Sequence, residues 1–292
     1  MKIICPCPSD FSDQMLNKLK KKFKCNFREI KQDKLNRIIK DYDVVLTRFN
    51  REIAFKNPNN LEYIITPTTG TNHIDKRYFK SKTKIISLFG EIKFLKNVNA
   101  SAEFTIYLIL KALKKFRLFN NKLSNEIYGK FIGIIGYGRI GKKIYPILEK
   151  MGAKVYIYDV KKSIVPKKKY KTLKQLLKVS DILSFHIPLN SENENIIGKN
   201  EINHLKENMI IINTSRGEIF DERHLLKKIL KSNIFYATDV LGKYFLNNLK
   251  NKKIQNKVIY TGHIAGLTNE SVKMTDEFVL KKFLKDIRNK KN

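Results

Sequence analysis

The segment FIGIIGYGRIGKKI, residues 131–144, decides the fold of the chain. It begins as an apolar run typical of a strand and ends in a stretch typical of a helix, with the pattern GxGxxG between them. Gly136 permits a tight turn, Gly138 lets the backbone approach a pyrophosphate, and Gly141 lets the helix pack on the strand. The helix N-terminus offers free N–H groups and a partial positive charge to the phosphates. We therefore expect a dinucleotide site, with a purely structural glycine turn as the alternative.

The next predicted strand, KVYIYD (154–159), ends in an acidic residue that bears on cofactor choice. Asp159 lies eighteen residues after Gly141, where a carboxylate accepts hydrogen bonds from both ribose hydroxyls and repels a 2′-phosphate. This spacing favours NAD over NADP. Lys161 and Lys162 follow closely and weaken the exclusion of the 2′-phosphate of NADP unless they point into solvent.

Outward from this segment, short β-branched or aromatic runs alternate with lysine-rich amphipathic stretches, a pattern typical of parallel α/β units. The pattern predicts strands at 2–5, 24–29, 43–48, 62–66, 83–88, 131–136, 154–159, 181–186, 209–213, 234–240 and 257–261. It predicts helices at 12–22 and 33–40 and one amphipathic helix from Asn269 to the end. The stretch SAEFTIYLILKALKKF (101–116) is apolar on most of its circumference, which indicates a helix in a large interface or between domains.

The composition limits the possible functions. A chain of 292 residues, of which 42% are hydrophobic and 29% charged, is typical of a soluble globular protein with room for two cores. No apolar window is long enough to predict a membrane span, and the first residues fit a strand better than a secretory signal. Cys5, Cys7 and Cys25 then indicate reduced thiols in the cytoplasm, and no spacing of His and Cys predicts a metal site.

The net charge of +32 raises the question of a nucleic-acid or anionic-membrane partner. Lysine, however, is spread over the whole chain together with abundant Asn, Ile, Phe and Tyr, a mixture typical of AT-rich codons. Clusters such as KLKKKFK (18–24) and KKSIVPKKKYK (161–171) suit solvated helix faces or loops. We therefore expect neither specific nucleic-acid binding nor membrane binding, only a general attraction of anionic metabolites.

Polar segments follow the later predicted strands: SFHIPLN (184–190), NTSRGEIFDE (213–222), ATDVLGKY (237–244) and TGHIAG (261–266). The carboxyl ends of parallel strands gather at one edge, where a nucleotide binds, so we expect these segments to meet there. Arg216 can present a planar fork to a carboxylate, and His263 can move a proton near neutrality. Taken alone, Arg216 reads as a surface ion-pair residue and His263 as part of a capped strand end. Together with the nucleotide turn, they indicate a site that binds a carboxylate and moves a proton.

The chain resembles the D-isomer-specific 2-hydroxyacid dehydrogenase family, NAD-dependent and phosphoglycerate dehydrogenase-like, over nearly its whole length. Besides GYGRIG, the matching segments are TTGTNHID (68–75), GEIKFL (90–95), AEFTIYLIL (102–110), HIPLN, INTSRG, TDV and HIAG. The resemblance implies an α/β fold with two doubly wound parallel-sheet domains, Rossmann-like or flavodoxin-like, and a cleft between them. The implied substrate domain comprises 1–97 plus 268–292, and the implied NAD-binding Rossmann domain comprises 98–267. It also implies a homodimer formed through the cofactor domains, with the long apolar helix at the interface.

The resemblance further implies the site residues. For NAD they are Gly136, Tyr137, Gly138, Arg139, Ile140, Gly141, Asp159, His186, Pro188, Thr214, Arg216, Asp239 and His263. His186 and Pro188 would line the pyrophosphate and ribose, and Thr214 and Asp239 would hold the nicotinamide end.

For the 2-hydroxy or 2-oxo acid substrate, Arg216 would bind the carboxylate and polarise the C2 oxygen, and His263 would be the general acid/base on that oxygen. The backbone at Thr69 and Gly70 would grip the carboxylate from the other domain. Arg48 would contact the distal part of the substrate or, equally, form a structural ion pair. The implied reaction is hydride transfer between C2 and the nicotinamide.

The chain departs from the family pattern beside His263. The family usually carries a Glu five residues after the TDV aspartate, hydrogen-bonded to the histidine, and here that position is Tyr244, with no acidic residue in 240–268. Gly262 also replaces the usual Pro. Three interpretations follow: another group such as Tyr244 orients His263, the Glu is dispensable at a modest rate cost, or the chain is a sensor- or corepressor-like NAD(H)-binding relative with weak or no turnover.

Overall fold

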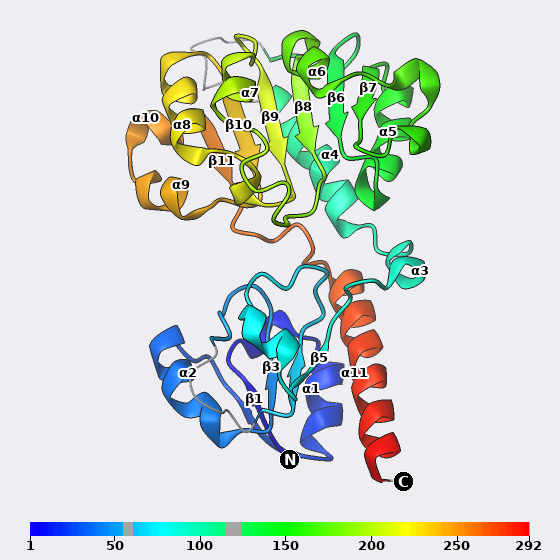
Figure 1. Ribbon diagram of the computed structural model, residues 1–292, viewed down its shortest axis with the longest axis vertical. Helices are drawn as coiled ribbons and strands as arrows, with labels where there is room; N and C mark the ends of the chain where they lie inside the picture. The colour runs from blue at the N-terminus through cyan, green and yellow to red at the C-terminus, as the bar shows by residue number, and fades with distance from the viewer. Residues whose placement is uncertain (55–60, 115–123, 292) are drawn as a thin grey trace. The chain divides into compact units, whose positions relative to one another are not determined.

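The computed structural model describes residues 1–54, 61–114 and 124–291. The chain divides into two compact units, of which unit 1 comprises Met1–Val98 and Leu267–Asn292 and unit 2 comprises Asn99–Gly266. These bounds differ by one residue from the domain bounds that the sequence predicts. Both units are built on parallel sheets, which confirms the predicted fold class (Figure 1).

Unit 1 holds a five-stranded parallel sheet of order β2-β1-β3-β4-β5. Its strands are β1 Lys2–Cys5, β2 Lys24–Phe27, β3 Val44–Leu46, β4 Tyr63–Ile65 and β5 Lys84–Ile86, and its helices are α1 Asp13–Lys20, α2 Gln32–Ile38, α3 Ile92–Leu95 and α11 Asn269–Lys291. Because successive strand residues point to opposite faces, Ile3 packs with α1 and α11 while Ile4 packs with α2. This strand order is the flavodoxin-like one, in which the winding reverses between β1 and β3.

Unit 2 holds a six-stranded parallel sheet of order β11-β10-β9-β8-β6-β7. Its strands are β6 Phe131–Ile135, β7 Lys154–Tyr158, β8 Ile182–Phe185, β9 Ile210–Asn213, β10 Phe235–Thr238 and β11 Val258–Tyr260. Its helices are α4 Ala100–Leu113, α5 Arg139–Lys150, α6 Leu173–Val179, α7 Lys199–Asn203, α8 Glu222–Lys231, α9 Lys243–Asn248 and α10 Lys252–Gln255. Helices α4 and α5 pack on one face of the sheet, and α6, α7 and α8 pack on the other (Figure 1). Here the winding reverses between β6 and β8.

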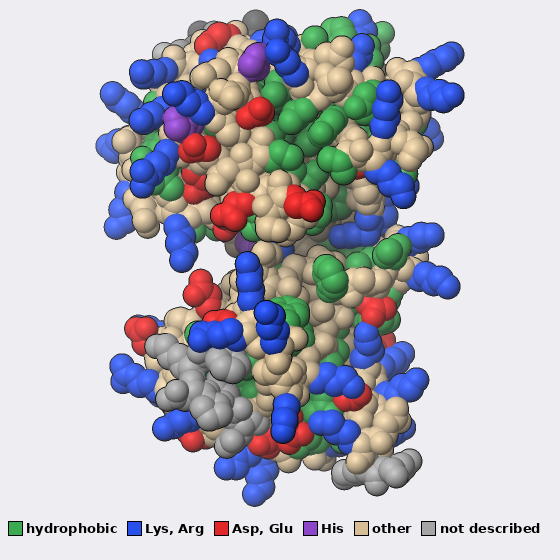
Figure 2. Space-filling model, viewed as in Figure 1, with side chains coloured by type: hydrophobic (Ala, Val, Ile, Leu, Met, Phe, Trp, Pro, Cys, Tyr) green, Lys and Arg blue, Asp and Glu red, His purple; other side chains and the backbone are tan. Residues whose placement is uncertain are grey.

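The predicted strands are all present, most of them one or two residues shorter at an end. The predicted helix over 101–116 is α4, and its last two residues lie outside the described residues. Lys and Arg side chains are spread over both units on the face shown in Figure 2 rather than gathered into one patch. Within the described ranges, no helix combines the length and apolar character that crossing a membrane requires, and no group of three or more His, Cys, Asp or Glu is placed to hold a metal ion.

Candidate active site

The predicted site residues of unit 2 lie at the carboxyl ends of its strands. In sheet order they are His263 after β11, Asp239 after β10, Thr214 and Arg216 after β9, His186 after β8, the glycine turn after β6, and Asp159 after β7. Parallel pairing therefore brings them to one edge, and the reversal between β6 and β8 marks where such sheets bind ligands.

The three glycines of the turn meet three different steric requirements. Gly136 has a φ of +97°, and a Cβ there would lie 2.6 Å from the carbonyl oxygen of His186. A Cβ on Gly141 would lie 2.2 Å from the carbonyl oxygen of Gly136. A Cβ on Gly138 would have no atom within 4 Å, so the space beside this residue is open at the N-terminus of α5. The turn thus has room for a pyrophosphate where a helix N-terminus favours one.

The Asp159 carboxylate is tied to the glycine turn. Its two oxygens accept hydrogen bonds from the backbone N–H groups of Tyr137 (2.7 Å) and Lys161 (2.8 Å). The Tyr137 ring is buried in the core edge-to-face against Tyr145, so Tyr137 reaches the turn only through its backbone. The remaining lone pairs of Asp159 fit ribose hydroxyls.

His186 is a neutral imidazole with one unused nitrogen. Its Nε2 pairs with the Ser184 hydroxyl at 2.8 Å, while its buried Nδ1 has no hydrogen-bond partner among the described residues. Burial lowers the pKa of His186 to about 3. The backbone carbonyl of His186 abuts Gly136, and the unused buried Nδ1 is the kind of atom that a polar cofactor group could satisfy. Pro188 follows on the exposed side of the same loop.

A buried asparagine that the sequence analysis did not single out shapes the loop after β9. The Asn213 amide nitrogen donates to the carbonyl oxygen of Arg216 (2.9 Å) and to the Tyr236 hydroxyl (3.1 Å), and its amide oxygen accepts from the N–H and the hydroxyl of Ser215. The loop presents Arg216, whose Nη1 donates to the Ser215 carbonyl (2.6 Å) and whose pKa is lowered by burial. The Thr214 hydroxyl pairs with that of Thr105 on α4 at 2.9 Å.

Asp239 holds the loop that carries His263. One carboxylate oxygen accepts from the Thr261 hydroxyl (2.5 Å) and the Ile264 N–H (2.9 Å), and the other accepts from the Ala265 N–H (2.9 Å). The backbone carbonyl of Asp239 accepts from the His263 N–H at 2.8 Å. Because Asp239 is buried, these bonds fix the loop firmly.

The backbone of this loop explains the glycine before the histidine. Gly262 has a φ of +83° and His263 a φ of +65°, so both lie in the left-handed region. A proline is confined to a φ near −65° and cannot adopt the conformation of Gly262. The loss of the family's usual proline therefore accompanies a different backbone path into His263.

The charge of Arg216 acts on the His263 imidazole. The pKa of His263 falls to about 4, because burial and then the positive charge of Arg216 lower it while Asp239 raises it. Arg216 and His263 follow β9 and β11, the two strands on either side of β10, at the same edge of the sheet. At neutral pH the imidazole is uncharged and is able to accept a proton.

The Tyr244 ring packs against Arg223. It lies in the first turn of α9, with its ring 5.5 Å from the Arg223 guanidinium carbon, and no hydrogen bond joins it to His263 in the described part of the chain. The Glu222 carboxylate accepts from the N–H groups of Gly242 (2.6 Å), Tyr244 (3.0 Å) and Phe245 (3.3 Å), which caps α9. The interpretation in which Tyr244 orients His263 gains no support from these contacts.

In unit 1, Thr69 and Gly70 lie in the loop after β4. The Thr68 hydroxyl donates to the Gly70 carbonyl at 2.8 Å and pairs with the Thr66 hydroxyl at 2.8 Å, which fixes the loop. Thr69 is exposed, so its backbone is accessible to a small anion.

Arg48, at the end of β3, forms the structural ion pair that was the alternative to substrate contact. Its Nη2 donates to Asp276 (2.8 Å) on α11, and its Nη1 donates to the Pro67 carbonyl (3.2 Å). Arg48 is 7% exposed and Asp276 0% exposed. The guanidinium is therefore committed to holding α11 on the sheet.

Comparisons with known proteins agree with this geometry. Residues 107–265 match the family model for the D-isomer specific 2-hydroxyacid dehydrogenase, NAD binding domain. The chain is 30% identical over 260 residues to an aromatic 2-oxoacid reductase of Clostridium sporogenes, covering 79% of this chain and 77% of that protein. It is 26% identical over 305 residues to a hydroxypyruvate reductase of Thermotoga maritima, covering 97% and 96%.

A solved structure gives the same picture over the whole chain. The NAD+-bound 3-phosphoglycerate dehydrogenase of Entamoeba histolytica matches with a TM-score of 0.78 and 25% identity, covering 99% of this chain and 96% of that one. The glycine turn, Asp159, Arg216 and His263 lie at one sheet edge, and the sequence and fold of the whole chain match those of these proteins. The chain belongs to the D-isomer specific 2-hydroxyacid dehydrogenase family and carries its NAD-binding domain.

Proposed function

We propose that this chain interconverts a D-2-hydroxy acid and its 2-oxo acid by NAD-dependent hydride transfer. The observation that carries the proposal is the placement of Arg216 after β9 and His263 after β11, at the sheet edge that also holds the glycine turn. A cation for a carboxylate and a neutral base for a hydroxyl proton are the two groups that this chemistry needs. A unit that only binds a nucleotide needs neither the cation nor the base.

The residues at this edge fit NAD. Gly138 leaves open space, Asp159 offers carboxylate lone pairs, and His186 offers an unused buried nitrogen. Thr214 and Asp239 would hold the nicotinamide end, as the family resemblance implies. When bound there, NAD would supply the hydride acceptor for oxidation at C2, and NADH the hydride donor for the reverse reaction.

Arg216 and His263 have separate roles, substrate binding and proton transfer. Arg216 binds the substrate carboxylate and polarises the C2 oxygen, while the backbone at Thr69 and Gly70 contacts the same carboxylate. In oxidation, neutral His263 takes the hydroxyl proton, and in reduction the imidazolium returns it to the C2 oxygen. Such a group contributes roughly 10²–10⁴ in rate.

The contacts of Asp239 favour a working enzyme over a relative that has lost its turnover. The buried carboxylate holds the His263 loop through Thr261, Ile264 and Ala265, and its charge favours the imidazolium. The usual glutamate is then dispensable at a modest rate cost. The alternative is a sensor- or corepressor-like protein, which binding of NADH without turnover of any 2-oxo acid would indicate.

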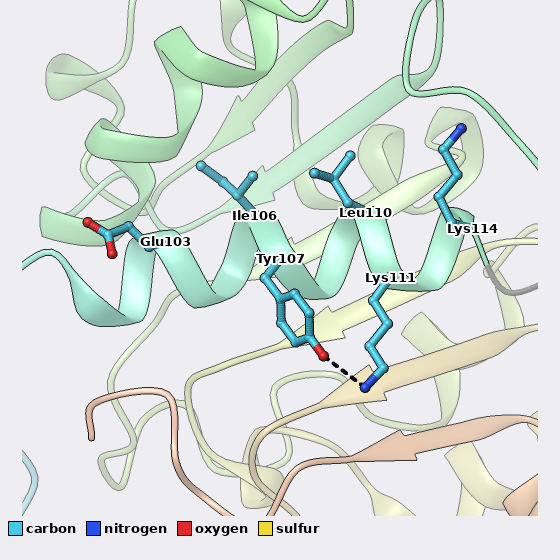
Figure 3. Close-up of a pocket in the computed structure, with 6 residues that line it drawn as sticks. All are labelled: Glu103, Ile106, Tyr107, Leu110, Lys111 and Lys114. Atoms are coloured by element: carbon cyan, nitrogen blue, oxygen red, sulfur yellow. Dashed lines mark hydrogen bonds between the residues drawn. The ribbon is translucent and has the colours of Figure 1, made fainter. Parts of the chain in front are cut away.

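We further propose that the chain forms a homodimer through the outer face of α4. Ile106, Tyr107 and Leu110 project from this face and line a shallow depression of about 570 Å³ (Figure 3). Tyr107 is 47% exposed, although it lies on a helix whose other face is buried in the core. An apolar strip of this kind on a helix suits burial against a second copy.

A cytoplasmic location also fits the chain. Cys5, Cys7 and Cys25 are free thiols, and burial raises the pKa of each. Free buried thiols suit a reducing compartment.

The proposed activity is tested by NADH oxidation with a panel of 2-oxo acids: glyoxylate, pyruvate, hydroxypyruvate, phenylpyruvate and 3-phosphohydroxypyruvate. We expect turnover with at least one of them, and the product should be the D isomer wherever C2 becomes chiral. An L product, or NADH binding with no turnover on the whole panel, would overturn the assignment.

A further inference from the structure

Helix α4 carries a buried hydroxyl that reaches the loop after β9. Thr105 is 0% exposed, and its Oγ1 lies 2.7 Å from the carbonyl oxygen of Ser101, one turn earlier on the same helix, and 2.9 Å from the Oγ1 of Thr214. Thr214 directly follows β9 and is half-buried, at the sheet edge that holds the glycine turn. The two hydroxyls thus join a helix that covers the sheet to the loop that carries Arg216.

The hydrogens available in these two contacts fix the direction of both hydrogen bonds. A threonine hydroxyl has one hydrogen to donate, and a backbone carbonyl has none. The hydrogen between Thr105 and Ser101 must therefore come from Thr105. The hydrogen between Thr105 and Thr214 must then come from Thr214, because Thr105 has no second one. A hydroxyl that has donated its hydrogen in this way presents only lone pairs to a ligand, so Thr214 acts as an acceptor.

The Thr214 oxygen is an available acceptor at this edge. In the described part of the chain, its hydroxyl has no hydrogen-bond partner other than Thr105. The other acceptor that the resemblance assigns to the nicotinamide end is the Asp239 carboxylate. This carboxylate belongs to a residue that is 1% exposed, and it already accepts three hydrogen bonds from the loop that carries His263. A donor on the nicotinamide therefore reaches Thr214 more readily than Asp239.

The carboxamide of nicotinamide has a donor end and an acceptor end, and an acceptor on the protein distinguishes them. The NH2 group of the carboxamide donates hydrogen bonds, whereas its carbonyl oxygen only accepts them. A Thr214 oxygen without a free hydrogen attracts the NH2 group and repels the carbonyl oxygen. The hydroxyl pair therefore favours one of the two orientations of the carboxamide about its bond to the ring.

We propose that Thr105 is a positioning residue for the cofactor: it takes up the Thr214 hydrogen and so makes Thr214 an acceptor for the carboxamide NH2 group of the nicotinamide. The inference rests on the proposed function, which places the nicotinamide at Thr214. It goes beyond that function because Thr105 lies on α4, outside the strand-end loops, and acts only through Thr214.

Isothermal titration calorimetry tests the inference with two oxidised dinucleotides, NAD+ and 3-acetylpyridine adenine dinucleotide, in which a methyl group replaces the NH2 group of the carboxamide. One hydrogen bond changes Kd by a factor of about 2–10, so we expect the wild type to bind NAD+ about fivefold more tightly than the analogue. In Thr105→Val the Thr214 hydrogen is free to turn toward the carbonyl oxygen that both dinucleotides keep, so their Kd values should come within about twofold of each other. Thr105→Ser keeps the hydroxyl and should keep the wild-type ratio.

Thr275→Val is the matched control, because Thr275 on α11 of unit 1 is 4% exposed and donates its hydroxyl to the Ser271 carbonyl, one turn earlier, at 2.7 Å. It loses the same atoms from the same kind of bond and should leave the ratio unchanged. Equal Kd values in the wild type, or tighter binding of the analogue, overturn the inference even if Thr105→Val does not fold. A ratio that persists in Thr105→Val, or that narrows as much in Thr275→Val, overturns it as well. Turnover of a 2-oxo acid with NADH by the same wild-type sample shows that the proposed function stands in any of these cases, and binding of neither dinucleotide overturns both.

Discussion

At the residue scale, the lowered pKa of His263 sets the pH dependence of the reaction. Reduction needs the imidazolium as acid, and with a pKa of about 4 the protonated fraction falls about tenfold for each pH unit above that value. Oxidation needs the neutral imidazole, which is fully present above the same pKa. We expect kcat/KM for 2-oxo acid reduction to fall steadily from pH 5 to pH 7 while oxidation of the hydroxy acid stays level. A reduction rate that is flat over this interval would contradict a pKa of about 4 for the group that supplies the proton.

Tyr244 provides a second test at this scale. Because no hydrogen bond joins its hydroxyl to His263, Tyr244→Phe should leave the midpoint of the pH–rate profile in place. The profile is measured with NADH and the best 2-oxo acid of the panel. A midpoint that moves by about one pH unit would mean that the phenol acts on the imidazole in the working enzyme.

The sequence predicted that Arg216 and His263 lie at strand ends on one edge of a sheet, and they do, because parallel topology fixes those positions. It did not identify what fixes them. Asn213 shapes the Arg216 loop through hydrogen bonds to backbone atoms, and such contacts leave no periodic signal in a sequence. The left-handed backbone at Gly262 is likewise indicated in the sequence only by the glycine itself.

At the element scale, substitutions at two glycines of the turn should have different effects, one on NADH binding and the other on the stability of unit 2. Gly138→Ala adds a methyl group into open space, so the melting temperature should stay nearly constant while NADH affinity falls by about tenfold or more. Gly141→Ala adds the same group 2.2 Å from the Gly136 carbonyl and should destabilise unit 2 by several kcal/mol, about 3 or more. Thermal unfolding and NADH fluorescence titration measure the two effects, and unimpaired NADH binding by Gly138→Ala would remove the turn from the cofactor site.

The ion pair of Arg48 with Asp276 predicts different stabilities for two substitutions on α11. Asp276→Asn leaves the buried Arg48 charge without its counterion and should lower the free energy of unfolding by about 3–5 kcal/mol. Glu277→Gln on the same helix breaks an exposed pair with Lys281 and should lower the free energy of unfolding far less, because solvent screens that pair. Urea unfolding compares them, and similar costs would contradict the structural role of Arg48.

Elements differed in how far the sequence predicted them. The inner strands β3, β4, β8, β9 and β10 are short apolar runs buried on both faces, and the apolar pattern predicts them clearly. Helices α9 and α10 have six and four residues with little periodicity, so the sequence pattern did not predict them. The pair of Arg48 with Asp276 joins residues 228 positions apart, and only the folded chain reveals which of the two predicted roles Arg48 takes.

At the scale of the whole molecule, the outer face of α4 predicts the oligomeric state. Tyr107→Asp places a charge in the proposed interface, so the mass in solution should fall from twice 34.2 kDa to 34.2 kDa. Leu230→Asp is the control, because Leu230 is 38% exposed on α8, on the opposite face of the sheet. Light scattering after size exclusion measures both, and a Tyr107→Asp variant that stays dimeric would place the interface elsewhere.

His263 is proposed to carry the proton of an NAD-dependent 2-oxo acid reduction, and His263→Ala removes that group. With the best 2-oxo acid of the panel and saturating NADH, we predict that kcat falls by roughly 10²–10⁴ while the Kd for NADH stays within about threefold. Turnover that is unchanged in His263→Ala, with NADH still bound, would contradict the account.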